Sequence, residues 1–267
     1  MQDRRSIVIT SNRKKLVLAV NKILYVQMIG KNAEIHVAGE QVYETRMTLN
    51  EIQENLGEDF IKIHRGCIVA SKAIYDITDT INLSNGETLM YTIRKKNQII
   101  TEFQERQRQI IRGFRKDGIP ENDQEYQECY RSFGWLPFAF TDIEMVFDEN
   151  HKAVDWIFRY GNQALAELEN VPLEQLIGSS FGSIFANMDS KWLRSYERAT
   201  LYGEMLEIMD YSPEIDAYLK VICFPTFEGH CGCILFKISD IQLVQDSDDA
   251  KKAMTLYFEK VRKFDDL

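Results

Sequence analysis

A cationic pair, His64-Arg65, lies inside the apolar stretch FIKIHRGCIVASKAIYDI at 60–77. The odd-numbered and the even-numbered residues of this stretch each include apolar and charged side chains. Neither face of a strand would therefore be entirely apolar. We therefore predict a short strand that ends in a turn carrying the pair. The arginine would offer a planar fork to a phosphate or a guanine edge, and the histidine would donate to phosphate. The alternative is structural, with His64 bracing the loop and Arg65 paired with an acid.

A second group of reactive side chains lies near the end of the chain, where Cys231 and Cys233 follow His230, and Cys223 belongs to the preceding apolar run. Thiolate and imidazole are zinc ligands, but zinc sites favour two to four residues between cysteines. On a strand, C-x-C separates the two residues by about 7 Å at ~3.3 Å per residue. We predict free, buried cysteines and no metal. A cysteine-based redox or metal sensor remains the alternative.

The cysteine count also bears on the compartment. Five irregularly spaced cysteines argue against a disulfide framework and favour a reducing cytoplasm. No apolar run approaches the roughly 20 residues of a membrane span, and the first residues lack the pattern of a secretory signal. We predict a cytoplasmic protein without a membrane partner.

Motifs typical of enzymes do not occur in the sequence. It has no glycine-rich phosphate loop, no G-x-S-x-G and no H-E-x-x-H. The carboxylates of 243–267 alternate with lysines, and its apolar residues have helical spacing, so we predict an amphipathic C-terminal helix that docks or dimerises. The sequence therefore predicts a protein that is not an enzyme.

The charge of −9 is unevenly distributed over the 267 residues. Residues 1–116 contain 19 Lys and Arg against 13 Asp and Glu, whereas 117–267 contain 13 against 28. A basic half in an acidic chain indicates contact with nucleic acid. Two ordinary solvated surfaces would give the same count, so charge alone leaves both interpretations open.

The basic half has the pattern of a β-rich domain. Short apolar runs recur between Asn, Gly, Asp and Lys clusters, and Asn85-Gly86 predicts a tight hairpin because both residues tolerate positive φ. One helix interrupts the series. Thr48 and Glu51 form a capping-box pattern at its start, and Gly57 marks its end.

This order of elements resembles the LytTR DNA-binding domain of bacterial transcriptional regulators over about residues 5–105. The matching segments are 23–26, 49–56, 60–65, 74–77 and 92–95. The resemblance implies an all-β domain at 1–105, with about ten strands and one short helix. Such a domain reads double-stranded DNA by placing loops, not a recognition helix, in the major groove.

The resemblance also implies the DNA-contacting positions. They lie in the loops and at the strand ends, and are Lys31, Asn32, His64, Arg65, Ser71, Lys72, Arg94, Lys95 and Lys96. The sequence departs from the family at Gly66, where serine is common, and at Ala70, where many members have asparagine. Losing that asparagine removes a side chain able to pair with adenine, so the base preference of other members does not transfer.

Helical periodicity begins after Arg94. Ile99, Phe103, Ile110 and Phe114 share one face, and Gly118 and Pro120 mark the end of the pattern. We predict a linker helix at 106–124 that joins two domains or pairs with its copy in a homodimer. A helix that caps the first domain is the alternative.

The back half, 125–242, has two expected strands, a helical region with Asn162-Gln163-Ala164 and Leu176-Ile177-Gly178, and three further strands. This order resembles a PAS sensor domain, and the resemblance implies an α+β fold with a five-stranded antiparallel sheet. The expected ligand pocket is lined by Phe158, Leu165, Phe181, Phe185 and Trp192, which would equally serve as core. No axial histidine or reactive Gly-x-Asn-Cys cysteine lies in 176–197, which disfavours haem and flavin, and we predict no cofactor.

Together these features predict a bacterial transcriptional regulator that binds promoter DNA through its front domain and is controlled by a ligand or protein partner at its rear domain. Only a few residues precede the first expected strand, so we expect the signal to come through the rear domain or a partner and not through a preceding receiver. The alternative is a protein-interaction scaffold that does not bind DNA.

Overall fold

The structure is a computed structural model that describes residues 5–39, 41–186 and 189–240. The chain divides into two compact units, Met1–Gly113 and Phe114–Leu267, referred to below as the N-terminal and C-terminal units. Each unit is described by itself.

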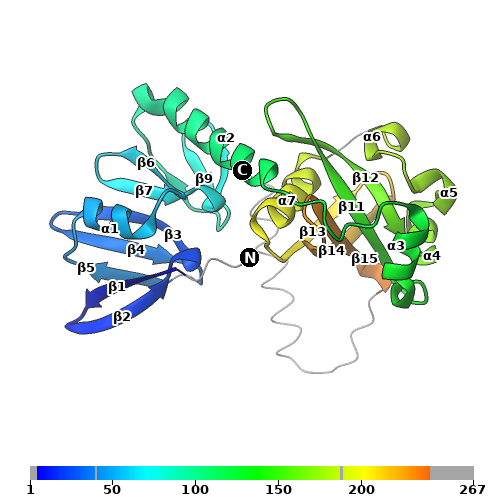
Figure 1. Cartoon of the computed structure of the whole chain (residues 1–267), viewed down its shortest axis with the longest axis horizontal. Helices are drawn as coiled ribbons and strands as arrows, with labels where there is room; N and C mark the ends of the chain where they lie inside the picture. Colours follow the sequence, from blue (N-terminus) through cyan, green and yellow to red (C-terminus); the bar gives the residue numbers. More distant parts are fainter. Residues whose placement is uncertain (1–4, 40, 187–188, 241–267) are drawn as a thin grey trace. The chain divides into compact units, whose positions relative to one another are not determined.

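Three antiparallel sheets make up most of the described N-terminal unit (Figure 1). Their ten strands are β1 (Ser6–Ser11), β2 (Lys14–Ala19), β3 (Ile23–Ile29), β4 (Asn32–Val37), β5 (Gln41–Thr45), β6 (Phe60–His64), β7 (Cys67–Ala70), β8 (Ile74–Ile77), β9 (Ile81–Leu83) and β10 (Thr88–Leu89). The largest sheet has the order β5-β4-β3-β7-β6, β8 to β10 form a meander, and β1 pairs with β2. The prediction of a β-rich N-terminal fold is confirmed.

Local sequence signals explain two connections in this unit. Helix α1 (Leu49–Leu56) begins with the predicted capping box, in which the Thr48 hydroxyl accepts from the Glu51 amide and the Glu51 carboxylate accepts from the Thr48 amide. The helix ends at Gly57, which has a φ of 77°. The β9–β10 hairpin turns at Gly86, whose φ is 85°. The capping box and the hairpin are confirmed, but of the two turn residues expected to take positive φ only Gly86 does so.

Helix α2 spans Lys96–Arg112, so it does not have the bounds of the predicted linker helix at 106–124. It starts directly after a 3₁₀ helix, Ile93–Lys95. Its last residue is Arg112, followed by the C-cap Gly113, so it ends before the predicted end at Gly118. Ile99 is 1% exposed, and Phe103 packs against the same core. This is the capping helix of the first domain that the sequence left as an alternative.

The last strand of this unit is shorter than its apolar run suggests. The run extends to Ile93, yet β10 ends at Leu89. Beyond it the Tyr91 hydroxyl donates to the Thr78 carbonyl at 2.6 Å and the Thr92 amide donates to the Ile63 carbonyl at 3.3 Å. These bonds take the chain away from β9 and bring it to the end of β6.

The described part of the C-terminal unit is built on one five-stranded antiparallel sheet in the order β12-β11-β15-β14-β13. Its strands are β11 (Ala139–Phe147), β12 (Ala153–Gly161), β13 (Leu206–Ser212), β14 (Ala217–Pro225) and β15 (His230–Lys237). Its helices are α3 (Asp123–Cys129), α4 (Gln163–Glu169), α5 (Leu173–Leu176), α6 (Phe181–Ile184) and α7 (Ser190–Tyr202).

The two faces of this sheet carry different cores. On one face, Ile143, Phe158 and Val221 pack with residues of α4 to α7. On the other, Phe140 and Tyr160 pack with Tyr126 and Tyr130 at the end of α3. Successive residues of a strand point to opposite faces, so β11 and β15 contribute to both cores.

The predicted C-terminal helix at 243–267 lies outside the described residues. Among the helices that the structure describes, none is both long and apolar enough to cross a membrane.

Candidate functional sites

Several turns of the N-terminal unit meet at one end of the five-stranded sheet. Ile29 pairs with Asn32 across the β3–β4 turn, and His64 pairs with Cys67 across the β6–β7 turn. Thr45, the last residue of β5, pairs with Ala33 at the same end, and the Met28 amide donates to the Gly66 carbonyl at 2.8 Å. We call this end, with its exposed Lys31, Arg46 and Arg65, the basic end.

The His64-Arg65 pair occupies the β6–β7 turn at the basic end. The Gly66 amide donates to His64 Nδ1 at 3.1 Å, so this nitrogen carries no proton. Burial and the neighbouring Arg65 charge lower the pKa of His64. Arg65 is exposed and has no acidic partner within the described residues. His64 therefore braces the turn, as the structural alternative proposed, while Arg65 remains available to an anion.

The other predicted residues at this end differ in whether their side chains already bind another residue of the protein. The Asn32 amide donates to the Glu44 carboxylate across the β4–β5 pair, and Lys96 pairs with Asp79 at 3.6 Å. Arg94 is exposed in the 3₁₀ helix that the Thr92–Ile63 bond anchors beside β6, and Lys95 is half-buried next to it. Arg94 thus lies at the basic end, although the strand that precedes it, β10, belongs to another sheet.

Ser71 and Lys72 lie at the opposite end of the same sheet. They follow Ala70, which pairs with Phe60 at the far ends of β7 and β6. Ser71 is 6% exposed, and the Lys72 ammonium donates to the Asn21 carbonyl. The structure therefore separates these two predicted residues from the others.

Two arginines at the basic end were not among the predicted contacts. Arg13, in the β1–β2 turn, and Arg46, after β5, line a groove together with Asn12 and Asn32. Asn12 and Arg13 have φ values of 48° and 63°, which suit a tight hairpin and turn both residues outward. The basic run Arg13-Lys14-Lys15 was the available sequence signal, and only the pairing of the strands shows which end it joins.

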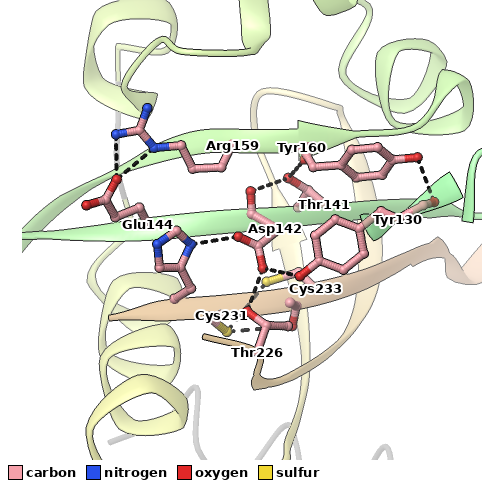
Figure 2. A network of polar contacts seen from close by, with 11 residues as sticks. Tyr130, Thr141, Asp142, Glu144, Arg159, Tyr160, Thr226, Cys231 and Cys233 are labelled. Carbon is pink, nitrogen blue, oxygen red and sulfur yellow. Dashed lines mark hydrogen bonds and ion pairs between the residues drawn. The ribbon is translucent and has the colours of Figure 1, made fainter. Parts of the chain in front are cut away.

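A buried polar network lies under α3 in the C-terminal unit (Figure 2). Asp142 of β11 is 0% exposed. Its carboxylate accepts from the Tyr130 hydroxyl at 2.7 Å and from the Thr226 hydroxyl, and His230 Nδ1 lies 2.7 Å from its other oxygen. Burial and the Asp142 charge raise the pKa of Tyr130. Three donors compensate the buried charge and fasten α3 to the sheet.

This network resembles a catalytic acid–histidine pair in composition but not in its surroundings. Tyr126 stacks on the His230 ring at 6.1 Å and Phe227 meets its face at 5.7 Å. The nearby thiols of Cys231 and Cys233 point into the other core of the sheet. No described nucleophile contacts His230, so the arrangement is suited to holding α3 and not to acyl transfer.

Three of the cysteines of this unit, Cys223, Cys231 and Cys233, are closer together than the sequence spacing predicted. The Cys231 and Cys233 sulfurs are 3.9 Å apart, and Cys223 pairs directly with Cys233 on the neighbouring strand. The expected separation of about 7 Å is the distance between the two backbone positions along the strand. The side chains of residues i and i+2 lie on the same face of the strand, where their sulfurs can approach more closely. All three are buried, and their thiol pKa values are raised: that of Cys223 first by its hydrogen bond with Cys231 and then by burial, and those of Cys231 and Cys233 by burial. Within the described residues, no three His, Cys, Asp or Glu side chains could hold a metal.

A cavity of about 50 Å³ lies on the α4–α7 face of the sheet. Four of the five predicted pocket residues, Phe158, Leu165, Phe181 and Trp192, line it, and Phe185 stacks on Phe181 behind them at 4.7 Å. Its walls also include Trp156, Tyr196, Glu169 and Glu214, which the sequence did not single out.

Comparison with known families identifies the N-terminal unit. Residues 13–103 match the LytTr DNA-binding domain. The prediction of a LytTR DNA-binding domain at the N-terminus is confirmed.

Individual relatives resemble parts of the chain. The sensory transduction protein LytT of Oceanobacillus iheyensis is 32% identical over 77 residues, which are 28% of this chain and 31% of that protein. The chain thus spans about a third of the length of this relative.

Two solved structures give looser overlays. The LytTr DNA-binding domain of a putative methyl-accepting/DNA response regulator from Bacillus cereus is 18% identical, with a TM-score of 0.32, and the overlay covers 38% of this chain and 94% of that one. The Rhodobacter sphaeroides LOV protein is 14% identical, with a TM-score of 0.33, over 48% of this chain and 73% of that one.

Proposed function

We propose that the protein is a transcriptional regulator that binds double-stranded DNA through the basic end of its LytTR domain. The observation that carries the proposal is the meeting of Arg65, Arg94, Lys31, Arg46 and Arg13 from separate turns at one end of the N-terminal unit. A row of exposed cations on rigid turns suits a phosphate backbone and the base edges between its strands.

Roles within the basic end follow from side-chain chemistry. Arg65 and Arg94 have the forked donors that fit guanine. Lys31, Lys95, Arg13 and Arg46 contact phosphates of the DNA backbone. His64 keeps the β6–β7 turn in shape and adds an Nε2–H donor. Ser71 and Lys72 take no part, because they lie at the other end of the sheet.

We further propose that the C-terminal unit is a PAS-like sensor that controls DNA binding. Support comes from its element order: two strands, four helices and three further strands, in which the five strands form one antiparallel sheet with a cavity on its helical face. The proposal assigns no chemical reaction to the protein. The cytoplasmic location and homodimer expected from the sequence stay predictions.

Salt-dependent DNA binding tests the first proposal. Binding of the full chain to labelled genomic fragments is measured by fluorescence anisotropy from low to moderate salt. The logarithm of the affinity should fall with the logarithm of the salt concentration by about 0.9 for each phosphate neutralised. Arg13→Ala and Arg46→Ala should each reduce this slope by about one unit, whereas the control Lys237→Ala, on β15, should not. A flat salt dependence would refute the proposal.

A redox sensor built on Cys223, Cys231 and Cys233 is the second candidate. Buried thiols with raised pKa values react slowly, because the thiolate is the reactive form. Iodoacetamide should modify the exposed Cys129 and leave these three intact in the native protein, as judged by mass spectrometry. Rapid modification of all three would favour the sensor.

A further inference from the structure

The cavity of the C-terminal unit has a charge that nothing in its wall balances. Three carboxylates line it, from Glu169, Asp189 and Glu214, and its described lining includes no lysine, arginine or histidine. The Asp189 carboxylate accepts from the Lys191 amide as the cap of α7, and that of Glu214 accepts from the Ser212 hydroxyl at 3.1 Å. Glu169 has no hydrogen bond or ion pair with any described residue. It is the unmatched group of the cavity.

Aromatic rings form part of the rest of the wall, together with aliphatic side chains such as Leu165, Leu219 and Val221. The rings of Trp156 and Phe181 are 4.4 Å apart, and Tyr196 meets Trp156 edge-on at 5.1 Å. Phe158 and Trp192 are the other aromatic residues of the lining. Faces of aromatic rings attract cations, above all the weakly hydrated ammonium groups that are wrapped in methyl groups.

We infer that this cavity binds a small organic ammonium ion, with the cation held among Trp156, Phe181 and Tyr196 and balanced by Glu169. The inference rests on the proposal that the C-terminal unit is a sensor, and it names the class of ligand. The size agrees, because about 50 Å³ of space admits a group of a few non-hydrogen atoms such as a trimethylammonium head. Glu214 is exposed and lies where a longer substituent would leave the cavity.

The position of Glu169 adds a separate argument. It is the last residue of α4, where the partial negative charge of the helix end disfavours a carboxylate. Burial and the nearby Glu214 charge raise its pKa to about 7. The titratable groups that interact with it are Glu214 and Tyr196, and neither is cationic. A bound cation would favour the ionised form, so affinity should rise with pH through neutrality.

Choline and its neutral isostere 3,3-dimethylbutan-1-ol provide the test, since they differ in charge and hardly in shape. Titration of the full chain by calorimetry at pH 8 should show choline binding at least about tenfold more tightly. Between pH 6 and 8 its affinity should rise about tenfold, as a group with a pKa of about 7 ionises. Glu169→Gln should remove both the preference and the pH dependence, while Glu174→Gln, an exposed acid on α5, should change neither.

Equal affinity for the two compounds, absence of choline binding, or an unchanged Glu169→Gln variant would each overturn the inference. Thermal unfolding of both variants serves as the control that each keeps its fold. The pH series on the wild type tests the inference without any variant. DNA binding is measured on the same samples. DNA binding without choline binding overturns the inference alone, and choline binding without DNA binding overturns the proposed function alone.

Discussion

The basic end of the N-terminal unit consists of side chains that point away from a finished core, whereas the cavity of the C-terminal unit is a space left inside one. Arg65 and Arg94 can change without disturbing packing, because no buried residue depends on them. Trp156 and Tyr196 belong both to the cavity and to the core. Function and stability are therefore separable in the first unit and joined in the second.

The two units also treat charge in opposite ways. At the basic end, Arg13, Arg46 and Arg65 have no acidic partner among the described residues and are screened by water and salt. In the C-terminal unit the buried charge of Asp142 is compensated by three donors, and Glu169 is held partly neutral by its surroundings. Substitutions in the second unit should thus act on stability and those in the first on binding.

The largest effect should come from Asp142→Ala. The substitution leaves buried donors of Tyr130, Thr226 and His230 without their acceptor, which should cost about 3–5 kcal/mol of unfolding free energy. Chemical denaturation followed by near-ultraviolet circular dichroism measures the loss. The exposed Glu174→Ala should cost less than about 0.5 kcal/mol. A loss as small for Asp142→Ala would show that the network does not support the fold.

Arg94→Ala should cost about 1–3 kcal/mol on the genomic fragment bound most tightly and leave weak non-specific binding nearly unchanged. Arg94→Lys keeps the charge but lacks the two-pronged donor geometry, so it should show most of the same loss. Anisotropy on specific and random DNA measures both. If Arg94→Lys binds as the wild type does, Arg94 contacts phosphate and not a base.

A pH effect on stability is expected from Glu169. Its pKa is raised to about 7 in the folded state from 4.5, so the folded protein holds this proton more tightly than the unfolded chain. Stability from this group is greatest below about pH 4.5 and falls as pH rises through about 7, by about 3 kcal/mol. The difference in unfolding free energy between wild type and Glu169→Gln, measured from pH 4.5 to 8, should therefore change by this amount. A constant difference would show that Glu169 titrates normally.

The smallest effect distinguishes the two ends of the five-stranded sheet. Lys95→Ala should weaken binding to specific and random DNA alike and lower the salt slope by about one unit. Lys72→Ala removes the same charge at the opposite end and should leave the slope unchanged. Equal slopes for the two variants would mean that DNA does not lie against the basic end.

The sequence by itself determined the elements whose cause is local. Thr48 and Glu51 define the start of α1, Asn85-Gly86 defines a hairpin, and the alternation of Ala33, Ile35 and Val37 places β4 on the core. These signals operate within a few residues, so they are complete in the sequence. The same is true of the charge asymmetry that indicated nucleic acid.

Only the tertiary structure decided which side chains meet. Strand pairing placed Arg13, Arg46 and Arg65 at one end and Lys72 at the other, since the direction of each strand in a sheet depends on partners far along the chain. The same holds for the cavity. In the sequence Glu169 belongs to an ordinary acidic helix. Its place in a partly aromatic cavity results from the packing of α4, α6 and α7 on one sheet. That packing depends on contacts far along the chain, so no local pattern encodes it.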